Sequence, residues 1–140
     1  MNVMWKWMIP LVLVGLLASF FVGQLTVQAE EFKKEDVKRW QKEFDTVVKQ
    51  GRALWVDGKL GTNGVACAQC HPNGANTHPE TYPKFQKQLG RVATLREMIN
   101  WCLQQPLEGK PLALDSKKMV AIEAYLAWER RGVKLAPGKH

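Results

Sequence analysis

Five consecutive residues, Cys67, Ala68, Gln69, Cys70 and His71, form the pattern C-x-x-C-H. This pattern is typical of covalent attachment of a c-type haem. Two thiols three positions apart can add to the two vinyl groups of one haem. The neighbouring imidazole then lies below the iron, where a neutral nitrogen serves as proximal ligand. We therefore predict one covalent haem c, held by Cys67 and Cys70, with His71 as its first iron ligand.

Two other interpretations of these residues are a C-x-x-C redox pair and half of a zinc site. A redox pair does not need His71. A zinc site needs a second Cys/His pair at metal-ligand spacing, which this sequence lacks. Haem attachment is also favoured by the export signal at the N-terminus, because c-type haem is attached on the outer side of the membrane.

Cys102 is the cysteine left over when the haem takes the other two. It could be a buried free thiol, half of an intermolecular disulfide, or the second axial ligand of the iron. Four other side chains offer a sulfur or nitrogen atom for that position: Met98, Met119, His78 and His140. Met119 suits core packing, His78 suits a hydrogen bond to a haem propionate, and His140 is the last residue. An open sixth position is the remaining possibility.

Apolar residues in steps of three and four predict an amphipathic helix over residues 33–57. The row comprises Val37, Trp40, Phe44, Val47, Val48, Leu54 and Trp55, with Gly51 among them. Gly51 would allow close approach of a second helix beside Tyr125. The segment that starts at Tyr82 and ends near Gly90 is predicted to be a short helix, after the loop that follows His71.

Two further helices complete the prediction. Thr94 and Glu97 form a capping box that starts a helix ending before Pro106. Its residues Leu95, Met98, Ile99 and Cys102 share one face. The last helix begins after Asp115 or Ser116, runs to about residue 131, and is followed by Gly132. Its buried rows are expected to pack against the first helix.

The first thirty residues differ in kind from the rest. An uncharged apolar run follows Lys6, and Val27, Gln28 and Ala29 offer a signal-peptidase site. Residues 7–27 are also long enough to cross a bilayer as a retained anchor, which takes about 20 residues. We predict a leader or anchor over residues 1–29 and one domain over residues 30–140. The expected location is the periplasmic side of the cytoplasmic membrane, either anchored or soluble after cleavage near Ala29.

The net charge of +7 favours acidic docking surfaces on partner proteins or anionic lipid. No arginine-rich or aromatic-interleaved pattern indicates nucleic-acid binding. A thiolate at Cys102 would lie near the C-terminal end of its helix, where the dipole disfavours negative charge. Iron would therefore have to hold it, helped by Arg91, Arg96 or Lys110.

The order of an amphipathic helix, C-x-x-C-H, a loop and a closing helix with Tyr125 and Trp128 resembles the small cytochrome c fold. Residues 82–85, 98–102, 109–112 and 115–126 are similar to the haem domain of the SoxA and thiosulfate dehydrogenase group. In that group a cysteine after an Ile-Asn-type helix can bind iron opposite the proximal histidine, and the matching position here is Cys102. Thiolate ligation would stabilise ferric iron and lower the reduction potential.

We therefore expect an all-α protein with a small cytochrome c fold around one covalent haem, preceded by an N-terminal hydrophobic helix. The first hypothesis for its function is an exported, membrane-tethered cytochrome that passes single electrons to redox partner proteins. The second is a haem-thiolate subunit of a thiosulfate- or sulfur-oxidising enzyme. The third is a fixed relay within a larger membrane complex.

Overall fold

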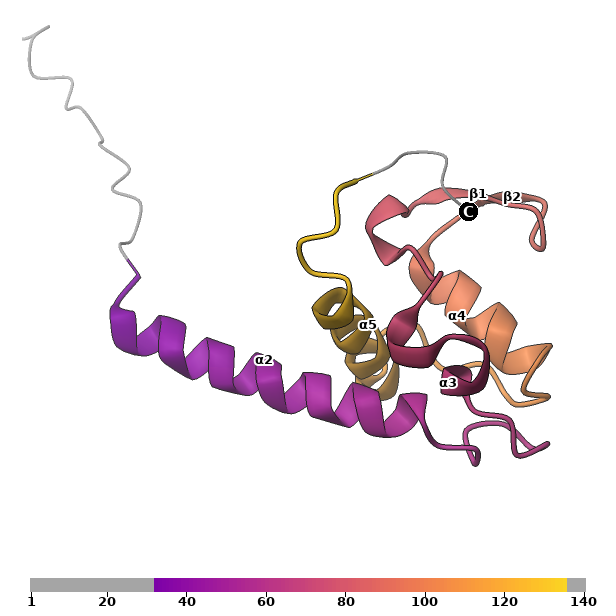
Figure 1. Cartoon of the computed structure of the whole chain (residues 1–140), viewed down its shortest axis with the longest axis horizontal. Coiled ribbons are helices and arrows are strands. Elements are labelled where there is room, and N and C mark those ends of the chain that lie inside the picture. The colour runs from indigo at the N-terminus through magenta and orange to yellow at the C-terminus, as the bar shows by residue number, and fades with distance from the viewer. Residues whose placement is uncertain (1–31, 136–140) are drawn as a thin grey trace, which may run out of the picture. The chain divides into compact units, whose positions relative to one another are not determined.

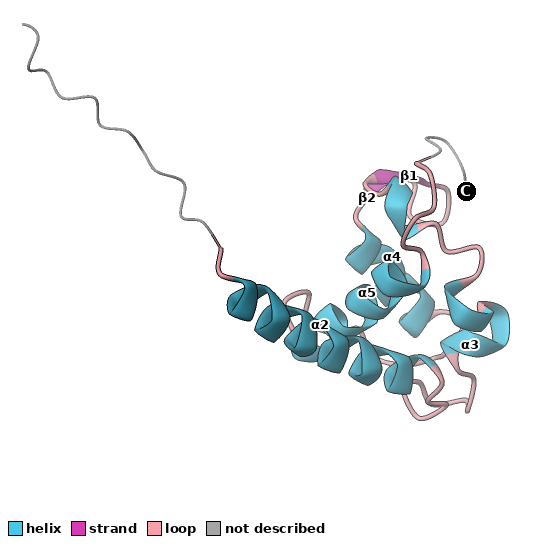
Figure 2. Cartoon of the chain, turned by 60° about the vertical axis from the view of Figure 1, so that its left-hand side comes forward, coloured by secondary structure: helices cyan, strands magenta, loops and turns pink. Residues whose placement is uncertain are grey.

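The computed structural model describes residues 32–135, which lie in the unit Lys33–His140 apart from Phe32. Four α-helices, two short 3-10 helices (η) and one two-stranded sheet make up this part of the chain (Figures 1 and 2). In chain order, the elements are α2 (Lys34–Trp55), α3 (Cys67–Cys70), η2 (Pro72–Gly74), η3 (Pro79–Thr81), β1 (Lys84–Gln86), β2 (Arg91–Ala93), α4 (Leu95–Gln104) and α5 (Lys117–Glu129).

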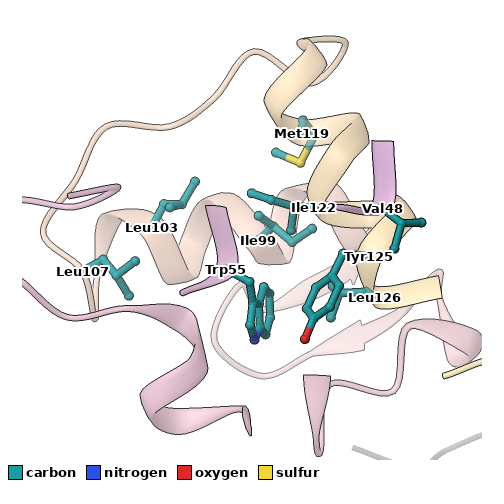
Figure 3. Close-up of a cluster of buried hydrophobic side chains, with 9 residues drawn as sticks. All are labelled: Val48, Trp55, Ile99, Leu103, Leu107, Met119, Ile122, Tyr125 and Leu126. Atoms are coloured by element: carbon teal, nitrogen blue, oxygen red, sulfur yellow. The ribbon is translucent and has the colours of Figure 1, made fainter. Parts of the chain in front are cut away.

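Helices α2 and α5 form the main packing contact of the domain, as the sequence predicted. They approach so closely at Gly51 that a Cβ atom built there would lie 1.9 Å from the carbonyl oxygen of Ala121. The rings of Trp55 and Tyr125 pack beside this crossing, with centroids 5.8 Å apart (Figure 3). Met119 is fully buried in the same core, which agrees with the packing role predicted for it.

The apolar stripe of α2 is buried over only part of its length. Val48, Gly51 and Trp55 are buried, whereas Val37 is 50% and Phe44 39% exposed. Figures 1 and 2 show the reason, because the first half of α2 extends beyond the other elements. The prediction that the stripe packs on the last helix is therefore confirmed for the part of α2 from Phe44 onward, since the rings of Phe44 and Trp128 of α5 have centroids 6.4 Å apart.

The starts of α4 and α5 are as predicted. The Thr94 side chain accepts a hydrogen bond from the backbone N–H of Glu97, whose carboxylate accepts from the N–H of Thr94. Ser116 caps α5 in the same way through the N–H of Met119. Asn100 then ties the intervening loop to α4, with two hydrogen bonds of 2.8 Å to the backbone of Leu112.

The prediction of a short helix from Tyr82 to Gly90 is wrong, and the all-α fold class is corrected with it. Strands β1 and β2 pair there as an antiparallel hairpin, with Lys84 opposite Ala93. Gly90, at φ +66°, allows the turn that a side chain would strain. Phe85 is half exposed and Leu89 is only partly buried, so the two large apolar residues of this stretch form no buried helical face. The domain is mostly helical with one small sheet.

No helix within residues 32–135 is long and apolar enough to cross a membrane. The predicted leader or anchor over residues 1–29, the boundary at residue 30, and His140 all lie outside the described residues.

Candidate haem-binding site

One cavity of about 430 Å³ lies between the C-x-x-C-H segment and α4. Cofactor and ligand pockets in proteins measure about 300–1,000 Å³. Cys67, Cys70 and His71 line one part of its wall. The helix face predicted from the sequence lines another part, with Leu95, Met98, Ile99 and Cys102. The structure therefore brings together all four residues predicted to hold a haem.

The two cysteines of the motif lie on the single turn of α3, which starts and ends at them. The backbone N–H of His71 donates to the carbonyl oxygen of Cys67 at 2.9 Å, which fixes the imidazole directly after that turn. Neither thiol forms a disulfide. Burial raises the pKa of Cys67 to about 11, whereas reactive C-x-x-C pairs have lowered thiol pKa values. The environment of Cys67 thus argues against the redox-pair interpretation.

The imidazole of His71 has a defined proton position. Its Nδ1 lies 2.9 Å from the carbonyl oxygen of Ala75, which can only accept a hydrogen bond. Nδ1 therefore carries the proton, and the lone pair of Nε2 is left for a metal. Trp55 supports the same residue, because its indole N–H donates to the His71 carbonyl at 2.9 Å. This is the protonation state that a neutral proximal ligand needs.

The zinc interpretation finds no support within residues 32–135. They contain no group of three or more His, Cys, Asp or Glu side chains placed to hold a metal ion. The cavity instead fits a haem, because a haem itself brings four of the ligands of its iron. The protein then needs to supply only the two attachment thiols, the imidazole with its free Nε2 and a sulfur-bearing helix.

Cys102 and Met98 are the two sulfur-bearing side chains of α4 that line the cavity. They lie one turn apart on the same helix face. Burial, with smaller contributions from Cys67 and Cys70, raises the pKa of Cys102 to about 11. The Cys102 thiol therefore stays protonated in the protein alone, and a thiolate at this position requires an adjacent cation such as ferric iron.

The other predicted sulfur and nitrogen donors are placed elsewhere. Met119 belongs to the core and does not line the cavity. His78 is buried away from the cavity, with its Nδ1 3.2 Å from Oε1 of Glu80 and 3.3 Å from a guanidinium nitrogen of Arg130. The Arg130 guanidinium also pairs with Glu80 at 3.3 Å. This cluster joins the loop after His71 to the end of α5.

The cations expected to support a thiolate are also placed elsewhere. Arg91 pairs with Glu97 and Arg96 pairs with Glu123, each at 2.8 Å. Neither arginine lines the cavity, and Lys110 does not line it either. Among the described residues, the lysines on the cavity wall are Lys84 and Lys87.

Lys84 and Lys87 come from the hairpin segment that the sequence analysis assigned to a helix. Tyr82 and Gln86 line the cavity beside them, and the Gln86 amide donates a hydrogen bond to the Tyr82 hydroxyl. The ammonium group of Lys84 lies 4.7 Å from the centre of the Tyr82 ring. The alternation of these residues along the sequence could have indicated a strand face, but they are polar, so the apolar pattern did not reveal it.

A helical domain whose C-x-x-C-H segment lines a cavity opposite a sulfur-bearing helix has the architecture of a c-type cytochrome. The sequence model of the family described as "SoxA/TsdA, cytochrome c domain" matches residues 50–135. The chain belongs to this family, which confirms the resemblance found in the sequence. A cytochrome c domain of this type implies covalently bound haem c.

Individual relatives agree with the family match. The chain is 38% identical to thiosulfate dehydrogenase of Psychrobacter arcticus over 74 residues, 47% of this chain and 23% of that protein. It is 34% identical to thiosulfate dehydrogenase of Allochromatium vinosum over 51% of this chain and 31% of that protein. It is 33% identical to L-cysteine S-thiosulfotransferase subunit SoxA of Rhodovulum sulfidophilum, over 64% of this chain and 32% of that protein.

The fold also has a solved counterpart. The crystal structure of SoxXA from P. pantotrophus superposes with a TM-score of 0.59 at 20% identity, covering 67% of this chain and 36% of that chain. At this identity the likeness concerns the fold alone. In the sequence comparisons, the matched part of this chain spans about a third or less of the length of each relative named above.

Proposed function

We propose that the chain carries one haem c and serves as a haem-thiolate subunit of a thiosulfate- or sulfur-oxidising system. In this proposal Cys67 and Cys70 attach the haem, His71 is the proximal ligand and Cys102 the distal one. The observation that carries the proposal is the position of Cys102, which lines the same cavity as the attachment motif from a separate element, α4.

The haem supplies one-electron exchange, and the protein residues set how readily it occurs. An anionic sulfur ligand stabilises ferric iron and lowers the reduction potential relative to a thioether. The hydrogen bond from His71 to the Ala75 carbonyl keeps Nε2 available and increases the electron donation of the ring. The half-buried Cys102 side chain keeps bulk water from competing for its position.

Sulfur oxidation is favoured over a general electron carrier by the relatives, three of which are named above as thiosulfate dehydrogenases or as a SoxA subunit. Oxidative coupling of two thiosulfate ions releases two electrons. A haem held by Cys67, Cys70 and His71 would take up one electron at a time, so a redox partner would have to accept the two electrons in turn. The hypothesis that ranked second in the sequence analysis is therefore the better supported one.

An electron relay in a larger complex is the second candidate. It is favoured by the SoxA relative, whose name describes it as one subunit of an enzyme. These two functions are distinguished by measuring thiosulfate turnover by the purified holoprotein with an artificial electron acceptor. Turnover that Cys102→Ala abolishes supports the sulfur-oxidising role. No turnover, together with rapid reduction by a partner cytochrome, supports the relay.

We also propose export to the periplasmic side of the cytoplasmic membrane, with residues 1–29 as anchor or cleaved leader. The net charge of +7 would favour partners with acidic docking surfaces. N-terminal sequencing of membrane and soluble fractions tests the location. An N-terminus at Met1 in pelleted haem protein supports the anchor, and one at Glu30 in soluble protein supports cleavage.

A further inference from the structure

The Ala75 carbonyl, which accepts the Nδ1 proton of His71, lies in a loop with unusual backbone angles. Asn76 and His78 follow it with left-handed conformations, at φ +61° and +48°. Residues other than glycine keep such angles only where surrounding contacts hold them. The position of this carbonyl against the proximal histidine therefore requires support from outside the loop.

The last turn of α5 contacts the loop on both sides of that carbonyl. Before it in the chain, Gly74 of η2 lies against α5, and a Cβ atom built on Gly74 would be 3.2 Å from Cδ2 of Leu126. After it, the side chain of Arg130 at the end of α5 reaches His78 and Glu80. The carbonyl that accepts from the proximal histidine is thus bracketed by two contacts with the same helix end.

The second contact is a buried charge cluster of His78, Glu80 and Arg130. All three side chains are mostly buried, and that of His78 is only 8% exposed. Burial raises the pKa of Glu80, but its backbone hydrogen bond and those with Arg130 and His78 outweigh burial and lower it, so the carboxylate is ionised at neutral pH. Within residues 32–135, Oε2 of Glu80 and Nε of Arg130 have no hydrogen-bond partner. Removing either member would therefore leave a further buried polar group unpaired.

Arg130 is the member that joins the loop to α5 in every state of the cluster. Nδ1 of His78 lies 3.2 Å from Oε1 of Glu80 and 3.3 Å from Nη2 of Arg130. A ring nitrogen either donates or accepts a proton, so it bonds to the carboxylate or to the guanidinium, and not to both at once. The ion pair between Arg130 and Glu80, at 3.3 Å, is available with either tautomer.

We propose that Arg130 is a positioning residue for the proximal ligand of the haem. By fixing the loop to the last turn of α5, it keeps the Ala75 carbonyl within hydrogen-bond distance of His71. That hydrogen bond increases the electron donation of the imidazole and so stabilises ferric iron. The inference rests on the haem and on His71 as proximal ligand, as in the proposed function, and does not depend on the sixth ligand or on thiosulfate.

The test uses full-length holoprotein. Arg130→Met removes the guanidinium, Arg130→Lys keeps its charge, and Glu80→Gln removes the charge of its acceptor at nearly unchanged shape. Arg131→Met is the matched control, because this neighbouring arginine is exposed and lies over the Trp128 ring instead. Ser116→Ala is the control for lost stability, because it removes the cap at the other end of α5.

Two readouts report the proximal hydrogen bond. The first is the midpoint potential of the haem. The second is the rate at which the Nδ1 proton of His71 exchanges with solvent, measured by nuclear magnetic resonance on ferric protein labelled with ¹⁵N-histidine. An iron-bound imidazole is recognised in these spectra by its hyperfine shift.

We expect Arg130→Met to shift the reduction equilibrium about tenfold toward ferrous iron, the lower end of the effects of groups that support a metal ligand. For one electron, tenfold corresponds to a rise of ~59 mV. Exchange of the His71 proton becomes faster, because its acceptor is held less firmly. Glu80→Gln changes both readouts in the same direction, and Arg130→Lys restores part of the wild-type values. Ser116→Ala lowers the free energy of unfolding and leaves the potential unchanged.

The proposal is overturned if Arg130→Met has the potential and the exchange rate of the wild type and of Arg131→Met. If Arg130→Met does not fold, Glu80→Gln and Arg130→Lys decide by the same two readouts. A His71 resonance without hyperfine shift would contradict the proposed function instead, because the imidazole would not bind iron. The exchange rate would still report the hydrogen bond to Ala75, so the two failures are distinguishable.

Discussion

Replacing Gly51 by alanine tests how the α2–α5 crossing supports the haem site. The added Cβ would lie 1.9 Å from the carbonyl oxygen of Ala121 and 2.7 Å from Cβ of Tyr125. The carbonyl is part of the α5 backbone, so no rotamer change relieves the collision. The two helices would have to separate, and Trp55, one turn along α2, would move with them.

Two effects of opposite sign compete in Gly51→Ala. Helix propensity alone would stabilise the protein by about 1 kcal/mol. Overpacking of a well-packed core costs about 1–3 kcal/mol and occasionally more, and a backbone collision belongs at or above the top of that range. We expect a net loss of about 2 kcal/mol, which lowers Tm by roughly 8–16 °C in a domain of this size.

This loss of stability is measured by thermal and denaturant unfolding of the holoprotein, with circular dichroism as the signal. Gln50→Ala is the matched control, because Gln50 is the exposed neighbour on α2 and surface substitutions change stability by about 0.5 kcal/mol or less. The haem absorption of Gly51→Ala should also change, since Trp55 contacts both Tyr125 and the His71 carbonyl. A Tm at or above that of the wild type would refute the reasoning.

Three further predictions concern attachment, core and charge. Cys67→Ala and Cys70→Ala should each reduce haem staining on a denaturing gel, because each removes one thioether bond; undiminished staining of the double variant would contradict haem attachment. Met119→Ala should cost about 2–5 kcal/mol in denaturant unfolding, since the side chain is 0% exposed, yet leave the iron closed to added cyanide; an iron that binds cyanide in this variant would contradict the packing role of Met119. The hydrogen bond from Arg91, then those from Thr94, lower the pKa of Glu97 to about 2. The stabilising effect of the ionised Glu97 carboxylate is therefore complete above pH 4.5 and is lost as the pH falls toward 2. Glu97→Gln should flatten the pH dependence of Tm between these two values. An unchanged slope would contradict the stabilising role of Glu97.

The helices were predictable because their signals are local. Thr94 and Glu97 define the start of α4 by their spacing, and Ser116 does the same for α5. Gly51 in an apolar row indicated a close helix crossing. The extent of burial was not predictable, because Val37 continues the same row but is 50% exposed. A periodic stripe shows which face is apolar, and only the tertiary structure shows what covers it.

The attachment side of the site was predicted from the C-x-x-C-H motif. Cys102 became a ligand candidate through the count of cysteines, the apolar face of its helix and the resemblance to the SoxA and thiosulfate dehydrogenase group. The hairpin part of the cavity wall was not predicted, because Tyr82, Lys84 and Gln86 alternate as polar residues rather than in an apolar pattern. Lys84 of β1 pairs with Ala93 of β2, and the sequence of neither strand alone specifies this pairing. The sequence analysis assigned the supporting cation to Arg91, Arg96 or Lys110. The structure pairs both arginines with glutamates, and none of the three residues lines the cavity.

The identity of the sixth ligand is tested most directly by the low-temperature electron paramagnetic resonance spectrum of the ferric full-length protein. We expect a low-spin signal of the thiolate type. Cys102→Met should replace it with a thioether-type signal and raise the midpoint potential, and Cys102→Ala should open the position to water or added cyanide. Met98→Leu, one turn away on the same cavity wall, should leave the spectrum unchanged. A wild-type spectrum in both Cys102 variants, with a change in Met98→Leu, would contradict thiolate ligation.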